Sequence, residues 1–186
     1  MVDRKTGFLF PEIEKAARKK PRKRARKTVP QQVLSKIHSA KDRQTRLKII
    51  QGVAKSRVSW VHEVLLYALE DPCEKIREFI IQELGAAEKL NLNLIYKRIQ
   101  HPPWYVKTGC LKILALQKKP SSVKHIEPLT KDPNIEVRRT AARVLGEIGG
   151  KDALALLANL STDTSAFVRA SAEQALKKAS NLKFSG

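Results

Sequence analysis

DPNIEVRRTAARVLG, residues 132–146, recurs along the chain in steps of 30 or 31 residues. Further copies begin at Asp71, His101 and Asp163, and each keeps an apolar residue followed by a basic one. These pairs are Ile76-Arg77, Val106-Lys107, Val137-Arg138 and Val168-Arg169. Four copies at a nearly constant period indicate a stacked array in which each repeat contacts its neighbours.

Each copy has the pattern of a helix that follows a turn. Asp132 precedes a proline, which disfavours the helical conformation at Asp132, and its carboxylate can accept hydrogen bonds from amides that open the next helix. The apolar residues then form one wide helical stripe, at Val137, Ala141, Val144, Leu145 and Ile148. Small residues at Ala141 and Ala142 allow a neighbouring helix to approach closely. We expect Gly146, Gly149 and Gly150 to end the helix.

A shorter apolar helix is predicted before each of these helices. The four segments are Trp60–Leu69, Leu90–Ile99, Val123–Leu129 and Ala153–Leu160. Helix, tight turn and helix, repeated along the chain, predict an all-α fold of the α-solenoid type with about four helical hairpins.

The pattern Asp-Pro-x-x-x-Val-Arg-x-x-Ala-Ala-x-x-Leu-Gly resembles HEAT-like repeats, particularly the short type of about thirty residues found in phycobilisome lyases. The resemblance covers roughly residues 58–180. It implies a right-handed solenoid, and a family that mostly binds other macromolecules and only occasionally carries chemistry.

Composition and pattern divide the chain into four parts. Residues 1–30 are predicted to be a disordered basic arm and residues 31–57 a degenerate repeat that caps the solenoid. Residues 58–180 form the repeats, and residues 181–186 are expected to be a short tail.

The arm concentrates positive charge. The chain has a net charge of +19, of which residues 1–30, with eleven Lys or Arg and three Asp or Glu, carry +8. Nine basic residues fall within residues 15–27: Lys15, Arg18, Lys19, Lys20, Arg22, Lys23, Arg24, Arg26 and Lys27. Such a run favours a polyanion, and phosphate contacts would give salt-sensitive binding of RNA or DNA without sequence specificity.

The sequence is also compatible with other partners for the arm. The apolar cluster of Phe8, Leu9, Phe10 and Ile13 beside the basic run would also suit a docking peptide, a membrane-surface anchor formed by residues 8–27, or a strap on the first repeat. The cluster is too short for a secretory signal, and no apolar run is long enough to span a bilayer. We therefore expect a cytoplasmic protein, although in a eukaryotic cell the basic run would pass for a nuclear localisation signal.

The basic residue of each Val-Arg pair has two interpretations. Arg77, Lys107, Arg138 and Arg169 could form a ladder of phosphate contacts, or each could pair with the turn acid of its own or a neighbouring repeat. Structural pairing is the favoured interpretation. In the second copy His101 replaces the turn acid and Lys107 replaces the arginine, so this copy is expected to lose both partners of the pair together.

The second copy departs most from the pattern, which favours a binding site there. Trp104 and Tyr105 could stack on a ligand beside Lys107 and Lys112, or could reflect irregular packing at a bend. Arg139 and Arg143, one helical turn apart, extend these candidates on the next copy. Acids at Glu136, Glu147 and Glu173 make the predicted inner face mixed in charge, which keeps a protein partner in view.

No catalytic, cofactor or metal motif is apparent. Cys73 and Cys110 have no metal-ligand spacing and are expected to be reduced, partly buried thiols. Deoxyhypusine hydroxylases bind iron through several His-Glu pairs, whereas this chain has the single pair His62-Glu63. A likeness to alkylpurine DNA glycosylases would rest on Trp104 and Tyr105 alone. The sequence thus predicts a non-enzymatic binding module, or alternatively a protein–protein adaptor whose tail contacts acidic protein or anionic membrane.

Overall fold

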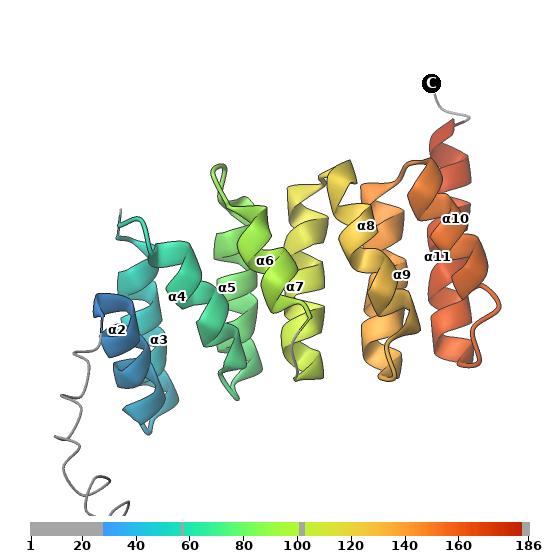
Figure 1. Cartoon of the computed structure of the whole chain (residues 1–186). Helices are drawn as coiled ribbons and strands as arrows, with labels where there is room; N and C mark the ends of the chain where they lie inside the picture. The colour runs from blue at the N-terminus through green and yellow to red at the C-terminus, as the bar shows by residue number, and fades with distance from the viewer. Residues whose placement is uncertain (1–27, 57, 101–102, 184–186) are drawn as a thin grey trace, which may run out of the picture.

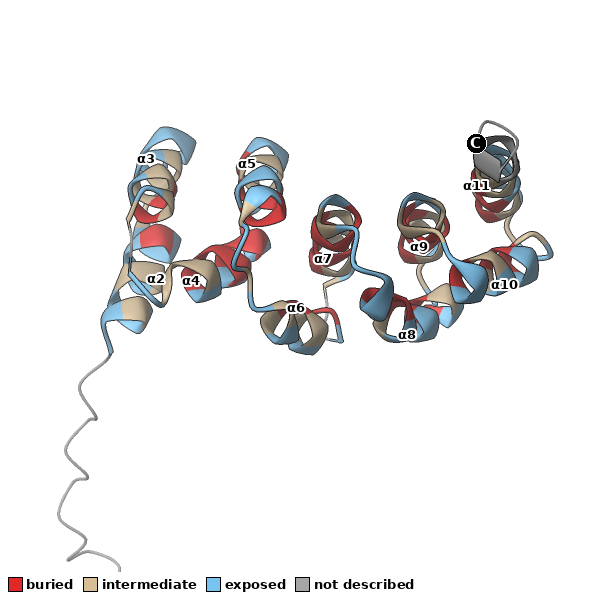
Figure 2. Cartoon of the chain, turned by 90° about the horizontal axis from the view of Figure 1, so that it is seen from above, coloured by how far each residue is buried: buried red, intermediate tan, exposed pale blue. Residues whose placement is uncertain are grey.

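The computed structural model describes residues 28–56, 58–100 and 103–183, which form two layers of helices in a curved row (Figures 1 and 2). The outer layer contains α2 (Val29–Ser39), α4 (Val61–Tyr67), α6 (Leu92–Arg98), α8 (Val123–Ile126) and α10 (Lys151–Leu160). The inner layer contains α3 (Arg43–Ala54), α5 (Glu74–Ala86), α7 (Trp104–Gln117), α9 (Ile135–Ile148) and α11 (Ala166–Lys183). Figure 2 shows the inner layer lining the hollow side of the arc. The predicted all-α solenoid is confirmed.

The core lies between the two layers and runs through every repeat (Figure 2). Leu69, Ile80, Leu111 and Leu145 are fully buried there, and Trp60 packs against the same cluster. Because each repeat exposes an apolar stripe on both sides, stacking removes that surface from water and supplies most of the stabilisation.

The outer helices are short for local reasons. Short 3₁₀ segments, η1 (Ala68–Glu70), η2 (Pro120–Ser122) and η3 (Glu127–Lys131), extend α4 and flank α8. Pro128 lies at the start of η3, where it lacks the amide needed to continue α8. The helix expected over residues 123–129 therefore ends at Ile126.

Two predictions are wrong, one about the glycine at position 146 and one about the turn acid Asp132. Gly146 does not end α9 but lies inside it, where a Cβ would come within 2.6 Å of the Ala175 Cβ on α11. It is therefore a point of close helix approach, and Gly149, with φ of 71°, is the residue that follows the helix. Asp132 does not cap α9 either, because its carboxylate accepts from the amide of Asn134, whose own side chain caps the helix.

The two ends of the row also differ from expectation in detail. The sequence places the capping repeat at residues 31–57, whereas α2 begins at Val29, within the segment assigned to the arm, and forms with α3 a hairpin that packs on α4. At the other end α11 continues to Lys183, into the segment assigned to the tail. Across the described residues, none of the helices is both long and apolar enough to cross a bilayer.

Candidate functional site

A ladder of ion pairs links each repeat to the next. The guanidinium of Arg46 donates to the Asp71 carboxylate at 2.7 and 3.2 Å, and that of Arg138 donates to Asp163 at 2.8 and 3.0 Å. Lys107 donates to Asp132 at 2.6 Å. In all three pairs the acid follows the base by 25 residues, so each bond joins one inner helix to the turn of the following repeat.

Each arginine of the ladder binds the acid of the next repeat with one edge of its guanidinium and its own turn with the other. In Arg138, Nε and Nη2 contact the carboxylate, while Nη1 donates to the Asp132 and Pro133 carbonyls of its own turn. Arg46 divides its donors in the same way. The Asp163 pKa is lowered, primarily because Arg138 donates to its carboxylate. These side chains therefore hold the turns in place, which favours the structural interpretation over a phosphate ladder.

The ladder breaks at Arg77. Its Nη1 donates to the carbonyls of Asp71 and Pro72, both at 2.9 Å, as in the other repeats. No carboxylate in the described part of the chain pairs with its Nε and Nη2. The aligned acid position in the next repeat is His101, 24 residues after Arg77 because this repeat is one residue shorter, and it lies outside the described residues.

This arrangement corrects the expectation that the second copy loses both partners together. Lys107 keeps its acid, because pairing runs forward to the turn at Asp132. In sequence, the position aligned with the turn acid that would pair with Arg77 of the preceding repeat is a histidine, His101.

An aromatic pair stands beside the break. The Arg77 guanidinium lies over the Tyr105 ring, 4.9 Å from its centroid, and Trp104 meets the same ring edge-on at 5.9 Å between centroids. Tyr105 is half-buried against the core, whereas Trp104 is 47% exposed. The two aromatic residues open α7, so Trp104 is an exposed aromatic surface that contacts the Tyr105 ring over which Arg77 lies.

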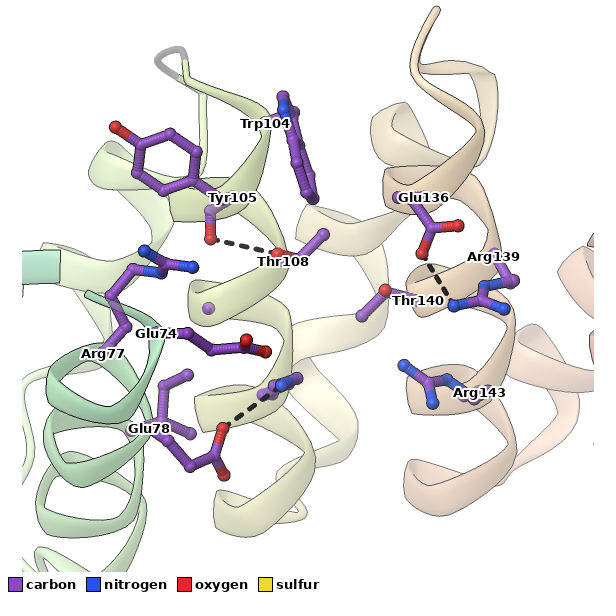
Figure 3. Close-up of a pocket in the computed structure, with 13 residues that line it drawn as sticks. Glu74, Arg77, Glu78, Trp104, Tyr105, Thr108, Glu136, Arg139, Thr140 and Arg143 are labelled. Atoms are coloured by element: carbon purple, nitrogen blue, oxygen red, sulfur yellow. Dashed lines mark hydrogen bonds and ion pairs between the residues drawn. The ribbon is translucent and has the colours of Figure 1, made fainter. Parts of the chain in front are cut away.

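These residues line a pocket of about 230 Å³ on the inner face, between α5, α7 and α9 (Figure 3). Figure 3 shows Arg77 reaching from α5 towards α7 below Tyr105, with Arg139 and Arg143 on the opposite wall. Glu74, Glu78 and Glu136 are the acids of the lining, and Lys112 lies on its floor helix α7.

The charges of the pocket are partly paired. Lys112 donates to Glu78 at 3.3 Å, and Arg139 donates to Glu136 at 2.8 Å. The Glu78 pKa is lowered by hydrogen bonds from Gln82 and then Lys112, so this group is a carboxylate at neutral pH. Arg143 is exposed, and the buried Nε of Arg139 has no acceptor among the described residues. The pocket is therefore mixed in charge, and donors of Arg139 and Arg143 have no described acid partner.

Five of the six solenoid residues predicted from sequence come together in this pocket: Trp104, Tyr105, Lys112, Arg139 and Arg143. The sixth, Lys107, is instead engaged in the ladder. The basic residues of the arm, 15–27, lie outside the described residues. Arg77 was assigned to structural pairing and so missed, although the histidine at position 101 was a signal that its acid was absent.

The described residues hold no cluster of His, Cys, Asp and Glu suited to a metal ion. Cys110 is buried, which raises the pKa of its thiol to about 12, and Cys73 is half-buried at the start of α5. His62 is half-buried on α4, away from the residues of the pocket.

The ladder, the paired layers and the repeat pattern together define an α-solenoid built from helical hairpins of about thirty residues. Residues 92–177 match the family model for HEAT repeats, which confirms the resemblance. Among solved structures, the chain is similar to the complex of CpcE and CpcF of phycocyanin lyase from Nostoc sp. PCC7120. The TM-score is 0.55 at 18% identity, over 88% of this chain and 69% of that chain, so the likeness concerns the fold alone. A comparison with curated proteins finds no match.

Proposed function

We propose that this chain is a non-enzymatic binding module that docks a protein on its inner face and holds a polyanion with its basic arm. The polyanion is RNA or DNA, bound through its phosphates without reading sequence. The observation that carries the proposal is the inner-face pocket, where an exposed aromatic residue adjoins cations at the one described break of the ladder.

The chemistry of the pocket suits recognition of a protein. Trp104 offers apolar surface, and the surrounding guanidinium and carboxylate groups offer directional bonds of both signs. Buried aromatic residues and arginines supply most of the binding energy in protein interfaces. Three successive inner helices also expose an apolar side chain in their first turn, namely Trp104, Ile135 and Phe167. A partner lying across the inner face would cover this row.

The lining favours binding over catalysis. Glu78 is held ionised by its hydrogen bonds, and its lowered pKa suits an ion pair rather than proton donation at neutral pH. The phycocyanin lyase named above has a similar fold and is a complex of CpcE and CpcF. This supports assembly with a protein partner as the use of the solenoid.

The arm carries the second half of the proposal. Nine basic residues among the thirteen of residues 15–27 would each neutralise a phosphate and release counterions. Glu74, Glu78 and Glu136 on the inner face would repel a phosphate backbone, so the arm is the better place for nucleic acid. The two partners would then occupy separate parts of the chain.

Fluorescence anisotropy with random-sequence RNA and duplex DNA probes tests the arm, between about 50 and 300 mM salt. The full-length protein is compared with a variant in which Arg22, Lys23, Arg24, Arg26 and Lys27 are all changed to Gln. The matched control changes five exposed lysines of the outer layer to Gln: Lys36, Lys97, Lys124, Lys131 and Lys151. Both variants lose the same net charge.

We expect the arm variant to bind at least about tenfold more weakly and with a shallower salt dependence, while the control stays near wild type. Equal losses in the two variants would mean that net charge alone attracts the probe, which contradicts a binding arm. No binding at the lowest salt would favour the alternative, in which the tail contacts acidic protein or anionic membrane. Vesicles with and without an anionic lipid then separate those two.

A further inference from the structure

We propose that the inner-face pocket binds an acidic side chain of the partner protein, whose carboxylate pairs with Arg77 in place of the acid that the ladder lacks. The inference rests on the proposed docking of a protein on the inner face. It adds the chemistry of the docked segment: an acidic residue next to an aromatic or large apolar one.

Arg77 is oriented as a carboxylate receptor by its own turn. Its Nη1 makes the same two carbonyl hydrogen bonds that hold Arg138, at 2.9 Å each. In Arg138 the remaining edge, Nε and Nη2, binds both oxygens of Asp163. Among the described residues no group accepts from the same edge of Arg77, so this bidentate donor pair is oriented by the Nη1 bonds and has no described partner. A carboxylate from outside would meet the geometry that the ladder uses elsewhere.

Arg169 shows that the missing acid alone does not make a site. Its described hydrogen bonds also go to its own turn, at the carbonyls of Asp163 and Thr164. However, Arg169 belongs to the last described repeat and lines none of the pocket, whereas Arg77 lines it beneath Tyr105 (Figure 3). The packing of Tyr105 over the guanidinium restricts its motion and shields one face from water, which strengthens a charged hydrogen bond.

The opposite wall of the pocket adds a second unsatisfied donor. The buried Nε of Arg139 has no acceptor in the part of the chain that the structure describes, although its Nη2 donates to Glu136. Arg143, one turn further along α9, is exposed to the same pocket. An anionic ligand in the pocket would therefore lie beside the guanidinium groups of Arg139 and Arg143.

A protein carboxylate fits better than a phosphate backbone. Three glutamates share the lining with four cations, so a chain with a charge at every unit would meet repulsion along its length. A peptide can place one or two acids on Arg77 and Arg139 and lay an apolar side chain on Trp104. The site therefore selects an acidic segment that carries an aromatic residue.

Trp104 provides the signal for a direct test. Full-length protein carrying Trp60→Phe keeps Trp104 as its one tryptophan, because the chain has two. The probe is acetyl-Asp-Glu-Phe-Asp-Glu-amide, and its control is acetyl-Asn-Gln-Phe-Asn-Gln-amide. We expect a saturable change of Trp104 fluorescence with the acidic peptide, and binding of the amide peptide at least about tenfold weaker, which corresponds to one charged bidentate contact.

Variants then assign the contact. Arg77→Gln should weaken the acidic peptide about tenfold, while Arg169→Gln, which loses the same two carbonyl bonds, should bind like the parent. His101→Asp restores the turn acid in sequence and should both raise the melting temperature and block the peptide. Unchanged binding in Arg77→Gln, or an equal loss in Arg169→Gln, would overturn the inference.

Failure of the peptide test can be distinguished from failure of the proposed nucleic-acid binding by the arm. Nucleic-acid binding by the arm is measured on the same preparations and does not involve Arg77. A peptide that fails to bind at millimolar concentration overturns the inference and leaves the arm's result standing. If a short oligonucleotide changes Trp104 fluorescence in a way that depends on Arg77, the pocket binds phosphate and the acidic peptide is the wrong ligand class.

Discussion

The guanidinium of Arg138 forms two hydrogen bonds with the carboxylate of Asp163, the turn acid of the next repeat. Both side chains are largely buried, at 12% and 9% exposure. This ion pair thus fixes the spacing between two repeats, because it joins the start of α9 to the turn before α11. Arg46 and Lys107 make the corresponding bonds, and Arg77 is the described exception inside the row.

Asp163→Asn should destabilise the solenoid by about 2 kcal/mol, because Arg138 loses a charged acceptor in a shielded position. Urea unfolding at neutral pH measures this difference. The control is Asp152→Asn, an exposed acid on α10, which should change stability by less than about 0.5 kcal/mol. Similar losses in both variants would mean that the ladder bond adds nothing specific.

The same bond predicts a dependence on pH. The Asp163 pKa is lowered from its usual 3.8 by the hydrogen bond from Arg138. Its contribution is therefore complete above the unfolded pKa and is lost as pH falls through the lower folded value. The stability gap between wild type and Asp163→Asn should be constant from pH 7 to about 5 and narrow below pH 3.8. A gap that widens in acid would contradict this assignment.

Gly146→Ala should destabilise the chain by about 1–3 kcal/mol, because the added methyl would meet Ala175 of α11 at 2.6 Å, with its backbone Cα at 3.2 Å. Gly52→Ala is the matched control on α3, where nothing lies within 4 Å of the new methyl. There the higher helix propensity of alanine should stabilise by about 0.5–1 kcal/mol. Opposite shifts of the urea midpoint are expected, and shifts of one sign would refute the close approach.

Lys118→Gly should stabilise the chain by about 1 kcal/mol, because Lys118 has φ of 47° in the left-handed region after α7. The next residue, Lys119, has φ of −92°, so Lys119→Gly relieves no strain and should give no gain. Thermal melts of the two variants distinguish strain from a simple loss of positive charge, which both share.

The two thiols should react with Ellman's reagent at very different rates. Burial raises the Cys110 pKa to about 12, whereas the backbone amide of Ile76 lowers that of Cys73 at the start of α5. At pH 8 we expect one thiol to react quickly and the second only as the chain opens. Cys73→Ser should remove the fast phase. A fast phase that persists in this variant would place Cys110 at the surface.

The repeat architecture could be predicted from sequence because it depends on spacing alone. Apolar residues at helical period, with Asp-Pro turns about thirty residues apart, leave few other ways to bury the stripes. Helix boundaries differ from the prediction where a single residue ends a helix early, as Pro128 in η3 does after α8. Gly146 was misread because a glycine at a helix end and one at a helix crossing look alike in sequence.

The pocket was harder to predict than the fold. Trp104, Arg139 and Arg143 were identified from their departure from the repeat pattern and from helical spacing, and the curved stack brings them together. The role of Arg77 depends on the direction in which the ladder runs, and one sequence leaves open whether an arginine pairs with its own turn or the next. For the same reason the sequence groups Lys107 with the contact residues, whereas in the structure Lys107 pairs with Asp132.

An NMR titration examines the docking site atom by atom. Full-length protein with ¹⁵N-labelled arginine and tryptophan is titrated with acetyl-Asp-Glu-Phe-Asp-Glu-amide, and the Nε–H resonances are assigned through Arg77→Gln, Arg139→Gln and Arg169→Gln. We predict that Arg77 Nε and the Trp104 indole shift together and saturate at one concentration, with Arg169 unchanged. Shifts confined to the arm, or equal shifts at Arg77 and Arg169, would contradict a carboxylate site on the inner face.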